Sequence, residues 1–385
     1  MRIAICTDQY LPLLSGLVDS VDTLATELRR QGHEVRIYTT GMKGAATDEC
    51  VFRFPTWYVP GSGNSISVSF PFGAMRNIRV FKPDVIHAHL FGSAGLFAWY
   101  AARRLGVPFV GTDHTFPADY LHYIKLDFPP FPYLARAYAA WFYGRCDLVT
   151  TPSERLLKEL RMYGLRVSTR LISNPIPHEF RPLPNKADLK KKFCIDGQAV
   201  AIFGRIAQEK NLDAALDVFV DIAPRSNAEL IFIGDGPYRA QLEHRVRNQA
   251  FSERVRFLGT LRGALLVEAI NACDLLLITS TSENQPMTLL QAMACELPVV
   301  AANAGGLPEY IWNDVSGYVV LPGDTKGFAD RILSVLNDPR RAADFGAAAK
   351  ESVAPYAPEA IAGQFLEVYN GAHGSRRQLL RAKVT

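Results

Sequence analysis

Short runs of apolar and β-branched residues alternate with segments of helical periodicity along most of the chain. Residues 2–7 (RIAICT) predict a buried strand, and residues 19–31 follow with apolar positions at helical spacing until Gly32. Helices are also predicted at 93–105 and 153–163, between the candidate strands HEVRIYTT, PDVIHAHL, VPFVGTDHT, CDLVTTPS and RLISNPI. This alternation predicts a parallel sheet that is covered by helices on both faces.

The alternation of predicted strands and helices stops after this first series of elements. Residues 175–197 contain four prolines within the first ten positions and then a short basic helical stretch, so we interpret residues 176–197 as an interdomain linker. The alternation restarts with AVAIFGRI, AELIFIGDG, VRFLG, CDLLLITS, LPVVAAN and GYVVLPG. The pattern predicts two tandem Rossmann-like α/β domains, doubly wound around parallel sheets, at residues 1–175 and 198–357, with further helices beyond Lys326.

Length and composition agree with this organisation. The chain has 385 residues, more than the ~250–300 that one hydrophobic core usually accommodates. Hydrophobic residues make up 48% and charged residues 21%, which excludes a largely disordered or fibrous protein. The start, MRIAICTDQYLP, does not resemble a secretory signal, and no apolar run approaches the ~20 residues that span a bilayer. We therefore expect a cytoplasmic protein whose six scattered cysteines are reduced.

The net charge of +4 arises entirely from the N-terminal half. Residues 1–180 hold 19 Lys and Arg against 15 Asp and Glu, whereas residues 181–385 hold 23 of each. This balance is too weak for a dedicated nucleic-acid-binding protein, and no DNA-reading motif is present. It would suit an acidic substrate or an anionic membrane surface, although so small a surplus can also lack a function.

Ligands of open α/β sheets bind beyond the carboxyl ends of the strands, so we expect the site in a cleft between the two domains. Ser15 and Gly16 lie after the first strand, where a glycine lets the backbone approach a ligand closely; a plain connection is the alternative. Gly204, Arg205 and Lys210 follow the first strand of the second domain. Two cations there would suit a diphosphate, and solvated surface charges are the alternative.

Two more positions are candidates for functional residues. Glu283 precedes a helix that starts near Pro286, so this carboxylate either accepts ligand hydroxyls or complements the helix dipole. His114 ends the strand VPFVGTDHT and is a candidate site residue of the N-terminal domain, with a structural histidine as the alternative. His87 and His89 point to one face of a strand, but no Glu or Cys partners accompany them, so we expect no metal site.

Several of these segments together resemble glycosyltransferase family 4, which has the GT-B fold. The resemblance rests on Gly204–Arg205 with Lys210, on GDGP at 234–237 and on SENQPMTLLQAMACELPVVAANAGGLPEYI, and it covers essentially the whole chain. It implies an N-terminal acceptor domain, a C-terminal donor domain for a nucleotide sugar, and a C-terminal helix at about 358–385 that packs back on the first domain. It also implies a retaining hexosyltransferase that needs no divalent metal or other cofactor.

The family signature has two glutamates separated by seven residues. Here Glu283 matches the first, which contacts hydroxyls of the donor sugar, and Gln291 replaces the second, which holds the ribose. Pro286 replaces a common glycine and lacks its N–H group. The resemblance then implies that Asn284, Gln285 and Met287 supply more of the donor contacts.

The other family roles transfer position by position. Arg205 and Lys210 resemble the pair that holds the leaving diphosphate, and together with His114 and Glu283 they are the implied catalytic residues. Ser15–Gly16 resembles the glycine loop that faces the donor phosphate. The segment 259–262, which contains Leu261, resembles the backbone that holds the base; a UDP-sugar is favoured and a GDP-sugar is next.

The acceptor is expected to contact residues 113–145, which are rich in aromatic side chains. His114 followed by Tyr120 and Tyr123 resembles enzymes that glycosylate diacylglycerol-type lipids. An aromatic segment flanked by cations such as Arg145 would suit peripheral contact with an anionic membrane, and an ordinary buried helix with a proline-kinked loop is the alternative. A lipid or lipid-linked acceptor is thus favoured over a soluble sugar, glycan or small molecule. A phosphorylase or epimerase, or a catalytically weak nucleotide-sugar-binding protein, remains a further alternative.

Overall fold

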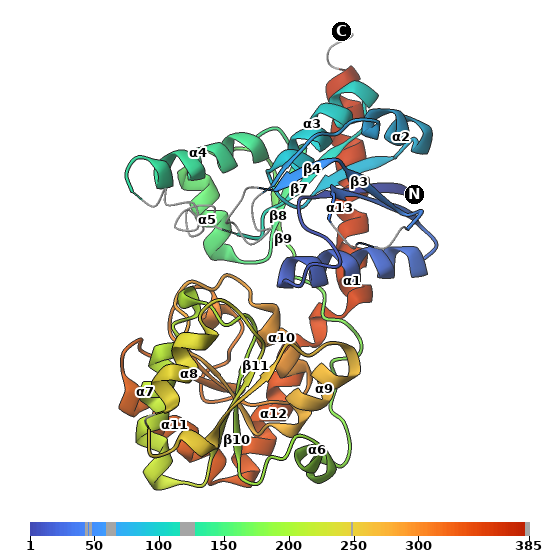
Figure 1. The fold of residues 1–385 in the computed structure, drawn as a ribbon. Coiled ribbons are helices and arrows are strands. Elements are labelled where there is room, and N and C mark those ends of the chain that lie inside the picture. Colours follow the sequence, from blue (N-terminus) through green and yellow to red (C-terminus); the bar gives the residue numbers. More distant parts are fainter. Residues whose placement is uncertain (43–44, 46–47, 59–66, 116–127, 248, 382–385) are drawn as a thin grey trace. The chain divides into compact units, whose positions relative to one another are not determined.

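The computed structural model describes residues 1–381 apart from 43–44, 46–47, 59–66, 116–127 and 248 (Figure 1), and for residues 58, 67–68 and 373–381 it describes the backbone alone. The chain divides into two units. The first unit comprises Met1–Pro175 and Pro358–Thr385, and the second comprises Ile176–Ala357.

A seven-stranded parallel sheet forms the centre of the first unit, with strand order β3-β2-β1-β6-β7-β8-β9. Its strands are β1 (Arg2–Thr7), β2 (Glu34–Thr40), β3 (Val51–Phe54), β6 (Val85–Ala88), β7 (Phe109–Thr112), β8 (Leu148–Thr151) and β9 (Thr169–Leu171). A separate antiparallel hairpin pairs β4 (Thr56–Tyr58) with β5 (Ser67–Ser69). The short strands β3 to β5 were not predicted, because three or four residues carry too little periodicity to identify a strand.

Five helices lie between these strands in sequence: α1 (Gly16–Arg30), α2 (Ala74–Phe81), α3 (Ser93–Leu105), α4 (Phe131–Tyr143) and α5 (Glu154–Met162). The last helix of the chain, α13 (Pro358–Arg381), also belongs to this unit. The bounds predicted for α3 are confirmed, and this helix ends at Gly106, whose φ of 71° suits a glycine. Helix α1 begins three residues before its predicted start, because the Ser15 hydroxyl caps it by accepting the N–H of Val18 at 3.3 Å.

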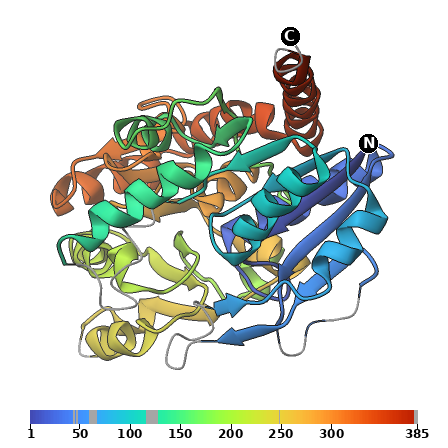
Figure 2. The same ribbon diagram turned by 90° about the horizontal axis from the view of Figure 1, so that it is seen from above.

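The two faces of this sheet are covered by different helices. Ala4 and Cys6 of β1 belong to a core that includes residues of α2, α3 and α4. On the other face, α13, the red C-terminal helix in Figure 2, packs against α1 and β7. Phe365 and Tyr369 of α13 are buried. The C-terminal helix is therefore a structural part of the first unit.

The second unit has a six-stranded parallel sheet in the order β12-β11-β10-β13-β14-β15. Its strands are β10 (Ala199–Phe203), β11 (Glu229–Ile233), β12 (Val255–Gly259), β13 (Leu275–Ile278), β14 (Val299–Ala302) and β15 (Gly317–Val320). Its helices are α6 (Lys186–Lys192), α7 (Leu212–Ile222), α8 (Arg239–Arg247), α9 (Gly263–Ala272), α10 (Met287–Ala294), α11 (Thr325–Leu336) and α12 (Pro339–Val353).

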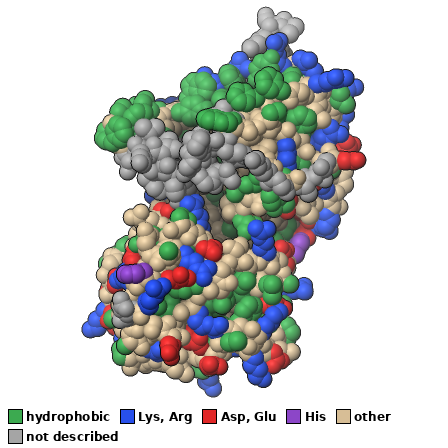
Figure 3. Space-filling view, in the orientation of Figure 1, with side chains coloured by type: hydrophobic (Ala, Val, Ile, Leu, Met, Phe, Trp, Pro, Cys, Tyr) green, Lys and Arg blue, Asp and Glu red, His purple; other side chains and the backbone are tan. Residues whose placement is uncertain are grey.

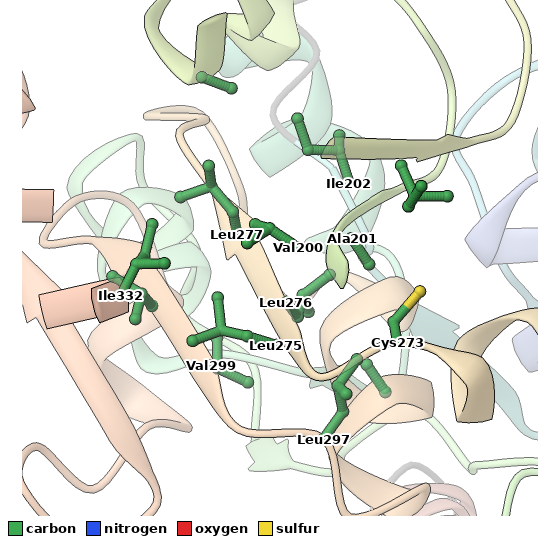
Figure 4. Close-up of a cluster of buried hydrophobic side chains, with 14 of the residues drawn as sticks. Val200, Ala201, Ile202, Cys273, Leu275, Leu276, Leu277, Leu297, Val299 and Ile332 are labelled. Atoms are coloured by element: carbon green, nitrogen blue, oxygen red, sulfur yellow. The ribbon is translucent and has the colours of Figure 1, made fainter. Parts of the chain in front are cut away.

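The core of the second unit is built from apolar strands that are buried on both faces. Figure 4 shows Val200 of β10, Leu276 of β13 and Val299 of β14 in one cluster with Ile332 of α11. Each of these side chains is at most 1% exposed, and burying one such side chain stabilises the fold by about 1.5–3 kcal/mol. This core holds the ends of the strands, and therefore the loops that follow them, in fixed positions.

Residues 176–197, which the sequence predicts to be a linker, lie in the second unit. Ile176, Phe180 and Ile195 are part of its hydrophobic core, and the N–H of Leu183 donates to the Asn271 side chain at 2.8 Å. The basic helical stretch expected there is α6. This proline-rich segment is thus packed into the second unit instead of standing apart from it.

Both units have Rossmann-like parallel sheets with alternating helices, so the predicted fold class is confirmed. In the part of the chain that the structure describes, no helix combines the length and the apolar content that a bilayer span requires.

Candidate functional site

The loops after β10 and β11 are joined by backbone hydrogen bonds at the carboxyl ends of these neighbouring strands. The N–H of Gly204 donates to the carbonyl of Ile233 at 2.9 Å, and the N–H of Ile206 donates to the carbonyl of Asp235 at 3.0 Å. Gly204 and Gly234 have φ angles of +123° and +147°. A Cβ on Gly234 would lie 1.9 Å from the Gly204 carbonyl oxygen, so only glycine allows this approach.

An ion pair joins the loops after β10 and β13, which are also neighbours in the sheet. The Lys210 ammonium lies 2.6 Å from Oε1 of Glu283. The two side chains are 32% and 11% exposed, so the pair is partly sheltered and still reachable from solvent. This contact fixes the orientation of the Glu283 carboxylate. Carboxylate oxygens in a fixed orientation are suited to accept hydrogen bonds from the hydroxyl groups of a ligand.

Backbone and side-chain contacts fix this pair from both sides. The Thr279 hydroxyl donates to the carbonyl of Asn211 at 2.8 Å, and the Asn211 amide donates to the carbonyl of Thr279 at 3.2 Å. The hydroxyls of Ser280 and Ser282 donate to the carbonyl of Glu209. Because Lys210 lies between the residues bound in this way, its backbone position is set by the loop after β13.

Arg205 is the second cation at this edge of the sheet. Its guanidinium is 43% exposed and lies 4.0 Å from the Glu209 carboxylate. Arg205 and Lys210 thus offer two positive groups within one short loop, one more accessible than the other, which can compensate the charge of a diphosphate.

The remaining donor-binding candidates are distributed around the start of α10. Asn284 is half-buried, whereas Gln285, Met287 and Gln291 are buried. Gln285 hydrogen-bonds Tyr310, and the Met287 side chain belongs to the hydrophobic core. For Met287 the structure therefore leaves the backbone N–H, one of the first of a helix, as the group that can meet a ligand.

Leu261 follows β12 and packs partly buried against the core of the second unit. It comes after Gly259, which has a φ of +71° and whose carbonyl accepts the N–H of Gly234 at 2.9 Å. The segment expected to hold the base is thereby tied to the loop after β11.

In the first unit, Ser15 and Gly16 are at the start of α1 and not in an open turn. The Ser15 hydroxyl caps the helix and donates to Oε1 of Gln9 at 3.4 Å, and Gly16 is exposed as the first helical residue. The backbone N–H groups of this first turn can bind an anion, while the Ser15 hydroxyl is already used in the cap.

His114 lies in a hydrogen-bonded group of histidines. Its Nε2 is 3.0 Å from Nδ1 of His89, whose Nε2 is 3.2 Å from Nδ1 of His87. Burial lowers the pKa of His114 to about 4 and that of His87 to about 3. Burial also raises the pKa of Asp113, the residue before His114, to about 8, so these groups are neutral at pH 7.

The predicted acceptor residues Tyr120 and Tyr123 lie outside the described residues. Of the aromatic segment, α4 is described: Phe142 and Tyr143 face the core, whereas Tyr133 and Trp141 are exposed. The predicted helix is therefore amphipathic, with both a core-facing side and an exposed aromatic side. Figure 3 shows hydrophobic side chains gathered over this helix.

Several site contacts were not predicted from the sequence. The Lys210–Glu283 pair joins residues 73 positions apart, and only the adjacency of β10 and β13 would have indicated it. His87 and His89 were considered as metal ligands, whereas the structure places them behind His114. Their position on one strand face was the available signal.

Comparison with known proteins identifies both units. The profile described as Glycosyltransferase Family 4 matches residues 14–180, and that described as Glycosyl transferases group 1 matches residues 186–352. An alpha-monoglucosyldiacylglycerol synthase of Streptococcus pneumoniae is 32% identical over 78% of this chain and 71% of its own length. A GDP-mannose-dependent alpha-mannosyltransferase of Mycobacterium tuberculosis is 27% identical over 98% of both chains.

Among solved structures, Anabaena HepE in complex with UDP matches with a TM-score of 0.76 and 21% identity, over 96% of this chain and 100% of its own. At this identity the likeness concerns the fold. The matches of both units and the identity to the S. pneumoniae synthase show that the chain belongs to glycosyltransferase family 4 and is a hexosyltransferase with the GT-B fold.

Proposed function

We propose that this enzyme transfers a hexosyl unit from a nucleotide sugar, with retention of configuration, to a membrane-lipid or lipid-linked acceptor. The observation that carries the proposal is the group formed by Arg205, Lys210 and Glu283 at the carboxyl ends of β10 and β13. It combines two cations for a diphosphate with one oriented carboxylate for sugar hydroxyls, which is the pair of functions that a nucleotide-sugar site needs.

The two cations act on the leaving group. Negative charge develops on the nucleoside diphosphate as the bond to the sugar breaks, and positive groups that are already in place stabilise it without reorganisation. Because the chain itself supplies Arg205 and Lys210, we propose that transfer needs no divalent metal. Removing one preorganised contact of this kind typically costs ~3–4 kcal/mol, or about 10²–10³ in rate.

Backbone groups complete the donor site in this proposal. The first N–H groups of α10, beginning at Met287, would contact anionic oxygens of the donor. Gln291 would hydrogen-bond the ribose, and the backbone near Leu261 would hold the base. UDP is the favoured nucleotide and GDP is the alternative, since the similar proteins include a UDP complex and a GDP-mannose-dependent enzyme.

Retention is supported by the product class of the relatives. Both the S. pneumoniae synthase and the M. tuberculosis enzyme are named for alpha-linked products. We propose the same α-linkage here, with His114 and Glu283 near the reacting sugar as implied by the family.

An exposed surface of the first unit supports a lipid acceptor. The Trp141 ring stacks with Tyr138 at 5.7 Å, meets Trp99 of α3 at 6.0 Å, and carries the Arg145 guanidinium 3.6 Å from its centroid. We call this group, together with Arg103 over Trp99, the arginine–aromatic surface. Amphipathic rings beside cations are suited to the interface of an anionic membrane, so we propose peripheral attachment of the enzyme to the cytoplasmic face of a membrane.

Donor and acceptor are tested in one assay. Release of nucleoside diphosphate would be measured from UDP- and GDP-sugars in EDTA, with and without vesicles of phosphatidylglycerol and diacylglycerol, and the product anomer would be determined by NMR. We expect release that rises on addition of vesicles and an α-linked glycolipid. A β-linked product would contradict retention, and equal turnover with a soluble sugar acceptor would contradict the lipid assignment.

The membrane contact has its own test. Trp141 is 43% exposed on α4, and Trp312 of the second unit is 50% exposed, so Trp312→Ala is a matched control for Trp141→Ala. Vesicle sedimentation should show weaker binding for Trp141→Ala alone. Equal binding of both variants and the wild type would show that the arginine–aromatic surface does not contact the lipid.

A further inference from the structure

Behind His114, a continuous chain of hydrogen bonds extends to the C-terminal helix. His114 Nε2 contacts His89 Nδ1 at 3.0 Å, His89 Nε2 contacts His87 Nδ1 at 3.2 Å, and this same nitrogen contacts the Tyr369 hydroxyl of α13 at 2.8 Å. On its other side, His87 Nε2 contacts the hydroxyl of Thr112 at 2.6 Å. Residues from β6, β7 and α13 thus meet in one network.

This network is shielded from water. His87, His89, Tyr369 and Thr112 are each at most 2% exposed. The ring of Phe365, also on α13, covers the two inner histidines with centroid distances of 5.2 Å to His87 and 6.5 Å to His89. Water therefore does not compete for the contacts among these inner residues, and each polar atom there depends on its protein partner, whereas His114 at the outer end is half-buried.

The three histidine rings of this network are neutral, and this fixes how many hydrogen atoms they can donate. Burial lowers the pKa of all three histidines, so each ring carries one N–H and one lone pair at pH 7. In every contact one atom must donate and the other must accept. The proton position on one ring therefore determines the proton position on the next.

Among the described residues, the Tyr369 hydroxyl has no hydrogen-bond partner other than His87 Nδ1, so its hydrogen is donated there and sets one direction for the whole chain. That nitrogen is then an acceptor with one lone pair, and His89 shares this lone pair by presenting its Nε2 hydrogen at 3.2 Å, because a second lone pair facing it would be repelled. His89 Nδ1 is then an acceptor, and His114 must carry its proton on Nε2. In this direction the Nδ1 atom of His114 carries the lone pair, and the Asn174 side chain, which also hydrogen-bonds His114, is a second polar contact of this ring. Donation from His87 Nε2 to Thr112 completes the same direction.

We infer that His89, His87 and Tyr369 are positioning residues that fix the ring orientation and the tautomer of His114. The C-terminal helix, whose Tyr369 lies 282 positions from His87 in sequence, is thereby part of the site in the first unit as well as part of its core. The consequence for turnover rests on the proposed function, in which His114 lies near the reacting sugar. The consequence for the tautomer does not.

Two variants of the full-length enzyme test the inference. Tyr369→Phe removes one hydroxyl and keeps the ring, and His89→Phe removes the contact to His114. Tyr38→Phe is the matched control, because Tyr38 is also fully buried in the first unit and its hydroxyl donates to the Asn77 side chain at 2.9 Å, away from the histidines. Thermal unfolding and UDP affinity would be recorded for each variant to verify the fold.

The direct measurement is the ¹⁵N NMR spectrum of the histidine rings, with the His114 signals assigned by their loss in His114→Gln. We expect the wild type and Tyr38→Phe to show His114 with its proton on Nε2, and Tyr369→Phe to show a mixture of tautomers. An unchanged His114 tautomer in both Tyr369→Phe and His89→Phe would overturn the inference.

Turnover is the second measurement. We expect kcat to fall about 10-fold in Tyr369→Phe, the upper range for loss of one hydrogen bond, and more in His89→Phe, while the KM for the donor stays within about twofold. A wild-type kcat in both variants, with His114→Gln inactive, would refute the coupling of the network to turnover. A fully active His114→Gln would instead refute the proposed role of His114, and the NMR result would still decide the positioning.

Discussion

The close approach of the loops after β10 and β11 allows a quantitative prediction for Gly234→Ala. The added Cβ would lie 1.9 Å from the carbonyl oxygen of Gly204, whereas carbon–oxygen contacts in proteins lie at about 3.3 Å or more. The two loops must therefore separate by roughly 1.4 Å. This movement would disturb the hydrogen bond from Gly204 to Ile233 and displace Arg205, the next residue.

A displacement of this size should strongly reduce transfer. Misplacing a reacting or stabilising group by about 1 Å can cost roughly 10²-fold in rate, so we expect kcat/KM for the donor to fall by about 10². The backbone strain of an alanine at a φ of +147° should in addition lower the free energy of unfolding by about 1–3 kcal/mol.

The control separates strain from displacement. Gly323, after β15 in the same unit, has a φ of +87°, and a Cβ added there would meet no described atom within 4 Å, so Gly323→Ala carries strain without a collision. Nucleoside diphosphate release and calorimetric UDP binding would be compared for both variants at a temperature where both are folded. Equal activity and equal UDP affinity in Gly234→Ala and Gly323→Ala would refute this description of the donor site.

Two further predictions concern single side chains. Gln291→Glu should tighten UDP binding in calorimetry if this side chain holds the ribose, because a charge-assisted hydrogen bond is roughly twice as strong as a neutral one; unchanged or weaker binding would contradict that role. Acidification acts on the first unit through groups of opposite sign. Unfolded histidines take up a proton near pH 6.5, whereas the folded pKa values of His87 and His114 are about 3 and 4, so each lowers the free energy of unfolding by about 1.4 kcal/mol per pH unit as the pH falls from 6.5 toward 4. Asp113, whose folded pKa of about 8 lies above its unfolded value, offsets one of these histidines over the same range. Asp113→Asn should therefore make the first unit more sensitive to acid: hydrogen exchange at pH 7 and pH 5.5, corrected for intrinsic rates, should show a larger loss of protection in the variant than in the wild type, and an equal loss would contradict this.

The strands and the donor-loop residues could be predicted because their signals are local. The run AVAIF followed by Gly204, Arg205 and Lys210 contains a buried strand, a conformationally special glycine and two cations within twelve residues. The structure places all of them as expected, at the carboxyl end of β10. Helix α3 was likewise predictable, because its apolar positions and its terminating glycine are adjacent in sequence.

Contacts between distant segments could not be predicted in this way. The pairing of Lys210 with Glu283 depends on the strand order, which places β13 next to β10 although two strands intervene in sequence. The partners of His87 depend on α13, at the far end of the chain. The start of α1 was misplaced because a single side-chain hydrogen bond, from Val18 to Ser15, decides where the helix begins.

The central claim is that Arg205 and Lys210 stabilise the leaving diphosphate. The most direct test is the rate of nucleoside diphosphate release in EDTA for the wild type, Arg205→Ala and Lys210→Ala, with Lys350→Ala as control because Lys350 forms a similar ion pair, with Glu296, at 2.9 Å on the surface of the same unit. We predict metal-independent turnover in the wild type and the control, and losses of about 10²–10³ in the two site variants. Wild-type rates in either site variant, or turnover that requires an added divalent metal, would contradict the account.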